Sequence, residues 1–124
     1  SRIKHIVLEN NVGIVHALNI GLSMAKGQYI ARMDADDVSI ATRFVRQVEF
    51  LDNNFEYAAC GSSITILSDH QERYKVKYPR KHSEIMAALC LFHRNISHPS
   101  VMIRAEIIKK FDIRYSGRYP HAED

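Results

Sequence analysis

Apolar positions along the chain alternate between strand-like runs and helix-like spacing. A short apolar run predicts a strand over residues 3–8, and apolar residues three to four positions apart predict an amphipathic helix over residues 12–26. A second strand is predicted over residues 29–33, where Arg32 is the one charged interruption. A strand, a helix and a strand in this order form a βαβ unit, which predicts a parallel strand pair with a right-handed crossover.

The alternation continues through the rest of the chain. Apolar spacing predicts three further helices and three further strands, the helices over residues 40–54, 83–92 and 105–111 and the strands over residues 57–67, 73–78 and 101–103. Gly61 falls inside the first of these strands, where it predicts a bend or a close backbone contact. The order of elements predicts an α/β fold.

Composition narrows the class of protein. At 124 residues, with 46% hydrophobic and 25% charged residues, the chain has the size and make-up of one soluble globular domain. The net charge of +3 permits an anionic partner, such as a phosphorylated ligand or an acidic membrane surface, without requiring nucleic acid. Cys60 and Cys90 form no CxxC pair, and their apolar surroundings predict buried, reduced thiols of a cytosolic protein.

Three carboxylates, Asp34, Asp36 and Asp37, follow the predicted strand over residues 29–33. We call residues 34–37 the acidic loop. Like charges this close raise one another's pKa unless a cation neutralises them, and oxygen ligands suit Mg²⁺ or Mn²⁺. Open α/β sheets also bind ligands at the carboxyl ends of their strands. The alternative is a solvated acidic turn in which Asp37 or Ser39 caps the next helix.

Other local patterns leave alternatives open. The sequence Asp34-Ala-Asp-Asp-Val38 matches the DxDx[TV] pattern of haloacid dehalogenase-type phosphatases, with Asp34 as nucleophile, although Arg32 and the preceding strand–helix unit argue against it. His98, beside Pro99, is a candidate ligand or phosphate donor, with a structural role as the alternative. Basic and apolar residues alternate over residues 73–78, as in a surface for nucleic acid or membrane phosphates, but a solvated edge strand is the favoured interpretation.

A series of short motifs runs along almost the whole chain: Asn11-x-Gly13, Ala17-Leu-Asn19-x-Gly21, Ala25-Lys-Gly27, Tyr29-Ile-Ala-Arg-Met-Asp-Ala-Asp-Asp37, Arg43 with Gln47, Gly61-Ser62, His98-Pro-Ser100 and Glu123-Asp124. In this order they resemble the central part of a bacterial family 2 glycosyltransferase with the GT-A fold. The resemblance implies a Rossmann-like mixed, mainly parallel sheet flanked by helices.

The resemblance also implies an activity. Family members transfer a sugar from a nucleotide-diphosphate donor, usually with inversion, and we expect a UDP-sugar donor and a saccharide or lipid-linked acceptor of surface polysaccharide synthesis. The expected location is the cytoplasm, with peripheral association at the inner face of the membrane. Mg²⁺ or Mn²⁺ would bind between the donor diphosphate and Asp36, with Asp34 near the ribose and metal and Asp37 in support. Asp124 matches the general base that deprotonates the acceptor. Further candidate site residues are Asn11, Gly13, Arg43, His98 and Glu123.

The chain departs from the family pattern at both ends. The Pro-Val-Tyr-Asn-like and Asp-Asp-Gly-Ser motifs that line the nucleobase pocket are not present, nor is the acceptor-side region that follows Glu123-Asp124. Leu18 stands where many members have arginine. We therefore expect residues 1–124 to be part of a catalytic domain, truncated at both ends. A non-catalytic module that binds metal or nucleotide is the alternative.

Overall fold

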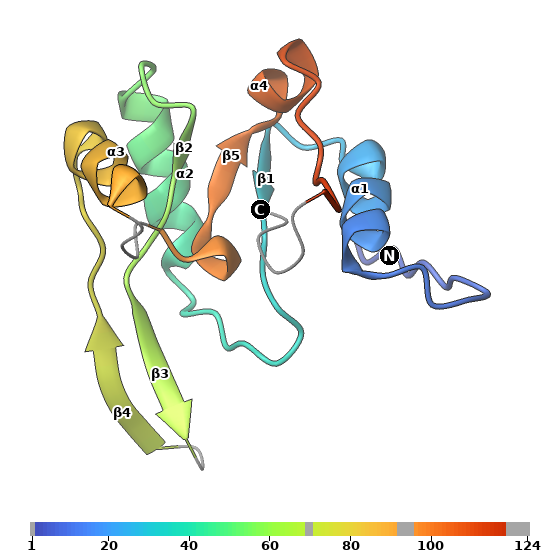
Figure 1. Cartoon of the computed structure of the whole chain (residues 1–124), viewed down its shortest axis with the longest axis horizontal. Coiled ribbons are helices and arrows are strands. Elements are labelled where there is room, and N and C mark those ends of the chain that lie inside the picture. The colour runs from blue at the N-terminus through green and yellow to red at the C-terminus, as the bar shows by residue number, and fades with distance from the viewer. Residues whose placement is uncertain (1, 69–70, 92–95, 119–124) are drawn as a thin grey trace.

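The computed structural model describes residues 2–68, 71–91 and 96–118 (Figure 1). Helices and short strands alternate along the chain, which confirms the predicted α/β class. The elements are α1 (Ile14–Met24), β1 (Tyr29–Ala31), α2 (Arg43–Asn53), β2 (Ala59–Cys60), β3 (Ile64–Ser68), β4 (Gln71–Val76), α3 (His82–Cys90), the 3₁₀ helix η1 (His98–Ser100), β5 (Met102–Arg104) and α4 (Ala105–Lys110).

The strands form two separate sheets. The first has the order β1-β5-β2, and its central strand β5 runs antiparallel to both neighbours, with Tyr29 opposite Arg104 and Cys60 opposite Met102. Consequently β1 and β2 run parallel to each other on either side of β5. The second sheet is the antiparallel hairpin β3–β4, which projects away from the rest of the molecule in Figure 1.

The predicted strand over residues 3–8 is not formed, so the predicted parallel pair with β1 is wrong. This segment is exposed and outside any described strand, and 82% of the surface of Ile3 is accessible. A strand is stable only where a neighbour pairs with its backbone N–H and C=O groups. Among the described residues β1 finds that neighbour in β5, far along the chain. Every ladder in the described part is antiparallel, so the mainly parallel sheet is also wrong for these strands.

The core gathers around β5. Its buried apolar side chains come from β5, the residue before it, α4 and α2: Leu51, Val101, Met102, Ala105 and Ile108. Neither flanking strand contributes a fully buried residue. Cys60 is half-buried beside α2, and burial raises the pKa of its thiol, whereas Cys90 is exposed. The predicted burial of Cys90 is therefore wrong, because the apolar residues around it on α3 are themselves largely exposed.

Gly61 separates β2 from β3, so the strand predicted over residues 57–67 is two strands. A Cβ atom at Gly61 would lie 2.7 Å from Cγ1 of Ile96 and 3.3 Å from Oγ of Ser100. The distance to Ile96 is shorter than van der Waals contact permits and the distance to Ser100 is tight, so the close approach predicted for this glycine is confirmed.

We expect Gly61→Ala to lower the free energy of unfolding by about 1–2 kcal/mol, because the added methyl group overpacks the space beside Ile96. Adding Ile96→Ala should recover part of that loss, since the two side chains compete for one space. Gly117→Ala is the matched control, because nothing lies within 4 Å of a Cβ atom there. Unfolding midpoints in urea measure the effect; equal midpoints for Gly61→Ala and Gly117→Ala would contradict it.

Arg104 joins β5 to the end of α2. Its side chain is buried, with 6% of the residue surface exposed, and donates hydrogen bonds to the carbonyl oxygens of Tyr57 (3.0 Å), Asn54 (3.3 Å) and Leu51 and to the hydroxyl of Tyr29 (3.2 Å). The carbonyls at a helix C-terminus have no partner within the helix. One guanidinium therefore satisfies the end of α2 and fixes it against the three-stranded sheet.

We expect Arg104→Met to lower the free energy of unfolding by about 3 kcal/mol, because it removes several charge-assisted hydrogen bonds and leaves buried carbonyls without donors. Thermal or urea unfolding of the full-length protein measures this loss. Arg46→Met, at an exposed position of α2, should change it by no more than about 0.5 kcal/mol. Similar midpoints for the two variants would contradict the role given to Arg104.

Candidate functional site

Three of the sequence motifs meet at one end of the three-stranded sheet. Because β5 is antiparallel to its neighbours, β1 and β2 finish where β5 begins, with Ala31 and Cys60 both opposite Met102. We call this the loop end of the sheet. The acidic loop leaves β1 there, Gly61 and Ser62 leave β2 there, and η1 leads into β5 there (Figure 1).

Within the acidic loop the three carboxylates have different surroundings. Asp34 forms an ion pair with Arg32 at 2.5 Å; their side chains are 39% and 14% exposed. The backbone N–H of Asp37 donates to the carbonyl of Asp34 at 3.3 Å, which closes a turn. Asp36 is exposed, and its carboxylate makes no hydrogen bond or ion pair with another described residue. Asp34 is thus neutralised within the protein, while Asp36 is accessible.

Arg32 lies at the candidate site, although it was not among the candidate site residues predicted from the sequence and was treated as an interruption of a strand within the motif that ends at Asp37. Its Nε and Nη1 atoms are buried without a hydrogen-bond partner among the described residues, and its remaining nitrogen binds Asp34. A charged side chain that is as little exposed as that of Arg32 needs a partner of opposite charge. The signal was therefore available in the sequence: an arginine in an apolar strand two positions before an aspartate.

The acidic loop can supply oxygen ligands but not a complete metal cage. In the described part of the chain, no three His, Cys, Asp or Glu side chains come close enough together to hold a metal ion. Mg²⁺ is commonly bound by one or two carboxylates, with substrate phosphates and water as the other ligands. The exposed carboxylate of Asp36, the residue before Asp37 in the chain, fits such a shared site and does not fit a metal site made of protein ligands alone.

Arg43 lies beside the acidic loop on the first turn of α2. Its Nη2 donates to the carbonyl oxygen of Arg32 at 2.9 Å, and its Nε donates to Oε1 of Gln47 at 3.0 Å. Partial burial lowers the pKa of the Arg43 guanidinium, while the negative charge of Asp37 opposes that shift. Arg43 therefore adds positive charge next to the acidic loop, where an anionic ligand would gain from it.

His98 is bound within the protein. Its Nε2 lies 2.9 Å from the hydroxyl of Tyr115, and the two rings are 5.4 Å apart. Asn19 of α1 fixes Tyr115 in turn: its side-chain amide accepts from the backbone N–H and donates to the carbonyl, both at 3.0 Å. Asparagine is a poor residue for a helix interior, so Asn19 was a sequence signal for such a tertiary bond. The contact with Tyr115 favours a structural role for His98.

The other predicted site residues are placed apart or lie outside the description. Asn11 and Gly13 lie in the exposed segment before α1, where Oδ1 of Asn11 accepts from the N–H of Gly13 at 3.0 Å. Gly13 has a φ of 78°, a backbone conformation that residues other than glycine rarely adopt. No hydrogen bond or ion pair of the described residues joins them to the acidic loop. Glu123 and Asp124 lie outside the described residues.

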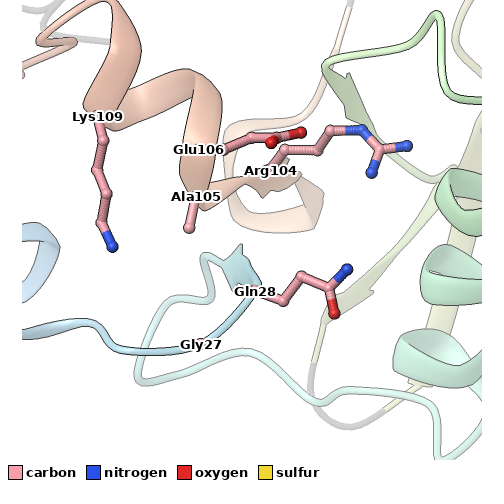
Figure 2. A pocket seen from close by; sticks show the side chains of 6 residues that line it. All are labelled: Gly27, Gln28, Arg104, Ala105, Glu106 and Lys109. Carbon is pink, nitrogen blue, oxygen red and sulfur yellow. The ribbon is translucent and has the colours of Figure 1, made fainter.

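A pocket of about 270 Å³ lies at the opposite end of β1 from the acidic loop (Figure 2). Figure 2 shows Glu106 and Lys109 projecting from α4 on one side of it, with Gly27 and Gln28 on the other. The N–H of Ala105 donates to the carbonyl of Gln28 at 2.9 Å across its base. This pocket contains none of the predicted site residues, so the candidate site is the loop end of the sheet.

Comparisons with known proteins identify the group to which the motifs belong. Residues 1–112 match the model of "Glycosyl transferase family 2". An uncharacterized glycosyltransferase of Haemophilus influenzae is 33% identical over 99% of this chain and 41% of its own length. The O-antigen biosynthesis glycosyltransferase WbnJ of Escherichia coli is 34% identical over 89% of this chain and 42% of its own length. The amylovoran biosynthesis glycosyltransferase AmsE of Erwinia amylovora is 29% identical over 64% of this chain and 30% of its own length.

The match to these relatives is partial in one respect. The chain spans about two fifths of the length of the first two curated relatives, at 41% and 42%. No solved structure matches it. The similarity to those two relatives therefore covers nearly all of this chain but less than half of each relative.

Proposed function

The chain belongs to glycosyltransferase family 2, and on that basis we propose that the protein transfers a sugar from a nucleotide-diphosphate donor to a saccharide or lipid-linked acceptor. The observation that carries the proposal is the acidic loop at the end of β1, within the part of the chain that the family model matches. Relatives are named for the biosynthesis of O-antigen and of amylovoran. We propose a corresponding role in surface polysaccharide synthesis.

We propose that the transfer depends on Mg²⁺ or Mn²⁺ held at the acidic loop together with the donor diphosphate. The accessible carboxylate of Asp36 supports its assignment as a direct ligand, and Asp37 adjoins it in the same turn. One oxygen of Asp34 is already bound by Arg32, which favours a supporting role for Asp34 beside the ribose and metal. When bound, the cation would neutralise the charge that develops on the leaving diphosphate.

A second carboxylate serves the acceptor in this proposal. A sugar hydroxyl is a poor nucleophile, so a positioned base must take its proton during attack on the anomeric carbon. We assign this role to Asp124 from the family resemblance, and a single displacement of this kind inverts the anomeric configuration. Asn11 and Gly13 are assigned to the donor site on the same basis, and a UDP-sugar is the proposed donor.

Turnover of nucleotide sugars by the full-length protein tests the proposed function. We expect release of nucleoside diphosphate only when both Mn²⁺ and an acceptor are present, and faster release from UDP-sugars than from GDP-sugars. Raised thermal stability with Mn²⁺ and UDP but no turnover would instead indicate a non-catalytic binding module. Release of inorganic phosphate from a phosphate ester, lost in Asp34→Asn, would indicate the phosphatase alternative. No binding and no turnover would contradict the proposal.

We also propose that the protein associates peripherally with the cytoplasmic face of the membrane through the basic segment of residues 73–82, which runs from β4 to the start of α3, in place of the solvated edge strand that the sequence pattern favoured. Residues 73–82 contain five lysine and arginine residues and no acidic residue, so the positive charge of this segment alone is larger than the net charge of +3 of the whole chain. Tyr74 on β4 is 57% exposed, and aromatic side chains favour the membrane interface. In the described part of the chain no helix is long and apolar enough to cross a bilayer.

Charge reversal at the end of β4 and directly after it tests this membrane surface. We expect the double variant Lys75→Glu, Lys77→Glu to bind vesicles of phosphatidylglycerol and phosphatidylcholine at least roughly thirtyfold more weakly, because each lysine near an anionic surface contributes about 1 kcal/mol and the added glutamates are repelled. Vesicle co-sedimentation measures this, with Lys109→Glu, Lys110→Glu on α4 as the control. Equal binding by both double variants, or binding to RNA in place of vesicles, would contradict the assignment.

A further inference from the structure

Two polar side chains on one face of α2 connect loops that are far apart in the sequence. Gln47 is buried, with 5% of its surface exposed, and both ends of its amide are used. Its Nε2 donates to the carbonyl oxygen of Ser100 at 2.8 Å, and its Oε1 accepts from Nε of Arg43 at 3.0 Å. Arg43, one helical turn earlier, donates from Nη2 to the carbonyl oxygen of Arg32 at 2.9 Å. We call these two residues the Arg43–Gln47 pair.

The first loop that the pair fixes is the acidic loop. Arg32 lies two residues before Asp34, and its side chain binds Asp34. The backbone of Arg32 is bound on both sides, because its N–H donates to the carbonyl of Val101 at 3.0 Å and its carbonyl accepts from Arg43. The acidic loop therefore starts from a backbone position that α2 and the β5 side of the sheet define together.

The second loop is the turn of η1. Ser100, whose carbonyl accepts from Gln47, is buried, and its hydroxyl accepts from the N–H of Ser62 at 3.0 Å. The same hydroxyl lies 2.8 Å from the carbonyl of Ser97 and 3.2 Å from that of Ser62. The loop that follows β2 is thus tied to η1, and η1 is tied to α2. Gln47 and Arg43 therefore fix the position of the acidic loop relative to η1 and to the loop that follows β2.

We propose that Gln47 and Arg43 are positioning residues of the donor site: they hold the acidic loop in place relative to η1, and so set its affinity for cation and donor. This inference rests on the proposed transferase function. Neither residue needs to touch the donor for this role. Their effect passes through the backbone of Arg32 to the carboxylates that follow it.

The chemistry of the two side chains suits this role. A buried amide is costly unless both its donor and its acceptor are bound, and Gln47 satisfies both conditions only while the Arg43 and Ser100 contacts exist. Glutamate at position 47 could still accept from Arg43 but could not donate to Ser100. Lysine at position 43 would keep the charge, but it lacks the planar fork that reaches Arg32 and Gln47 together.

The test compares Gln47→Glu and Arg43→Lys with Arg46→Lys, which alters an exposed arginine of the same helix. In the full-length protein we expect both positioning variants to raise the Mn²⁺ concentration for half-maximal activity and the KM for donor roughly 10–100-fold, the effect typical of groups that orient metal ligands. The KM for acceptor should stay unchanged. The unfolding midpoint without ligands should fall in Gln47→Glu, because the carbonyl of Ser100 loses its donor, so all kinetics are compared at a temperature where every variant is folded. Gln47→Glu removes the hydrogen bond to Ser100, whereas Arg43→Lys alters those to Arg32 and Gln47, so either variant provides the test if it folds.

Two results would overturn the inference. A lower unfolding midpoint with normal KM for donor and normal Mn²⁺ dependence would show that the Arg43–Gln47 pair only stabilises the fold. Kinetics identical to those of Arg46→Lys would show that the pair does not affect the site. In both cases transfer by the unaltered protein would leave the proposed function standing. An unaltered protein without metal-dependent transfer would overturn the proposed function and this inference together.

Discussion

Replacing Asp36 with asparagine is expected to lower kcat/KM for metal-dependent sugar transfer by roughly two to three orders of magnitude, the size of effect found when one preorganised charge-stabilising group is removed from an active site. The substitution keeps the shape of the side chain and removes its charge. Because Asp36 is exposed and has no partner among the described residues, the change should not disturb the fold. The loss would therefore report on ligand binding and transition-state stabilisation rather than on stability.

The measurement is steady-state transfer over a range of Mn²⁺ concentrations. Asp36→Asn should need more Mn²⁺ for half-maximal activity and should recover only part of the rate at saturating metal. Glu56→Gln, which also removes one exposed carboxylate but lies between α2 and β2, is the control and should match the unaltered protein. Unchanged turnover by Asp36→Asn would show that the acidic loop does not bind the donor cation.

Asp124→Asn is expected to have an effect of a different kind. A general base contributes roughly 10²–10⁴-fold to a rate, so we expect kcat to fall by that factor. Binding of Mn²⁺ and nucleoside diphosphate should persist, because the base acts on the acceptor hydroxyl and not on the donor. We therefore expect the two substitutions to have different effects. Asp36→Asn should weaken the binding of metal and donor, whereas Asp124→Asn should slow the chemical step.

Calorimetric titration with UDP and Mn²⁺, together with kcat at saturating substrates, checks this division. Asp112→Asn is a suitable control because Asp112 is exposed and its φ of 46° is one that asparagine also tolerates. A normal kcat for Asp124→Asn would remove it from the role of base. Loss of UDP binding in that variant would instead assign Asp124 to the donor site.

Local sequence patterns were sufficient for most of the helices and strands. The apolar spacing that predicted helices over residues 12–26, 83–92 and 105–111 corresponds to α1, α3 and α4 in the structure. This success has a physical basis, because the helical period depends only on residues three and four positions apart. The motifs that carried the family resemblance are also local runs, which is why the family was evident without a structure.

Predictions that depended on distant partners were less successful. Residues 3–8 have the composition of a strand, yet they remain outside any described sheet because composition does not supply a pairing neighbour. The single strand predicted over residues 57–67 is two strands, because the chain leaves the sheet at Gly61, where Ile96 and Ser100 pack against the backbone. Both outcomes follow from contacts with segments that no local pattern specifies.

The candidate site, too, was predictable from the sequence only where it depends on neighbouring residues. From sequence alone came the acidic loop, its place at the end of a strand, and the preference of its oxygen ligands for a hard divalent cation. The residue chemistry alone did not distinguish the three carboxylates, and only the family resemblance assigned Asp36 to the metal. The structure adds that Arg32 binds Asp34 and leaves Asp36 accessible. The sequence also did not show that Gln47 on α2 would bind Ser100, which lies 53 residues further along the chain.

The sequence by itself therefore determined the α/β class, most element positions and the family, and it supplied the residues that we propose hold a cation. Only the tertiary structure decided that β1 pairs with β5, whose Arg104 contacts Tyr29 across 75 residues of chain, and that three loops meet at one end of the sheet. The physical reason is the range of the forces involved. Periodicity and turn chemistry act between near neighbours, whereas strand pairing and buried hydrogen bonds are selected by the burial of the whole chain.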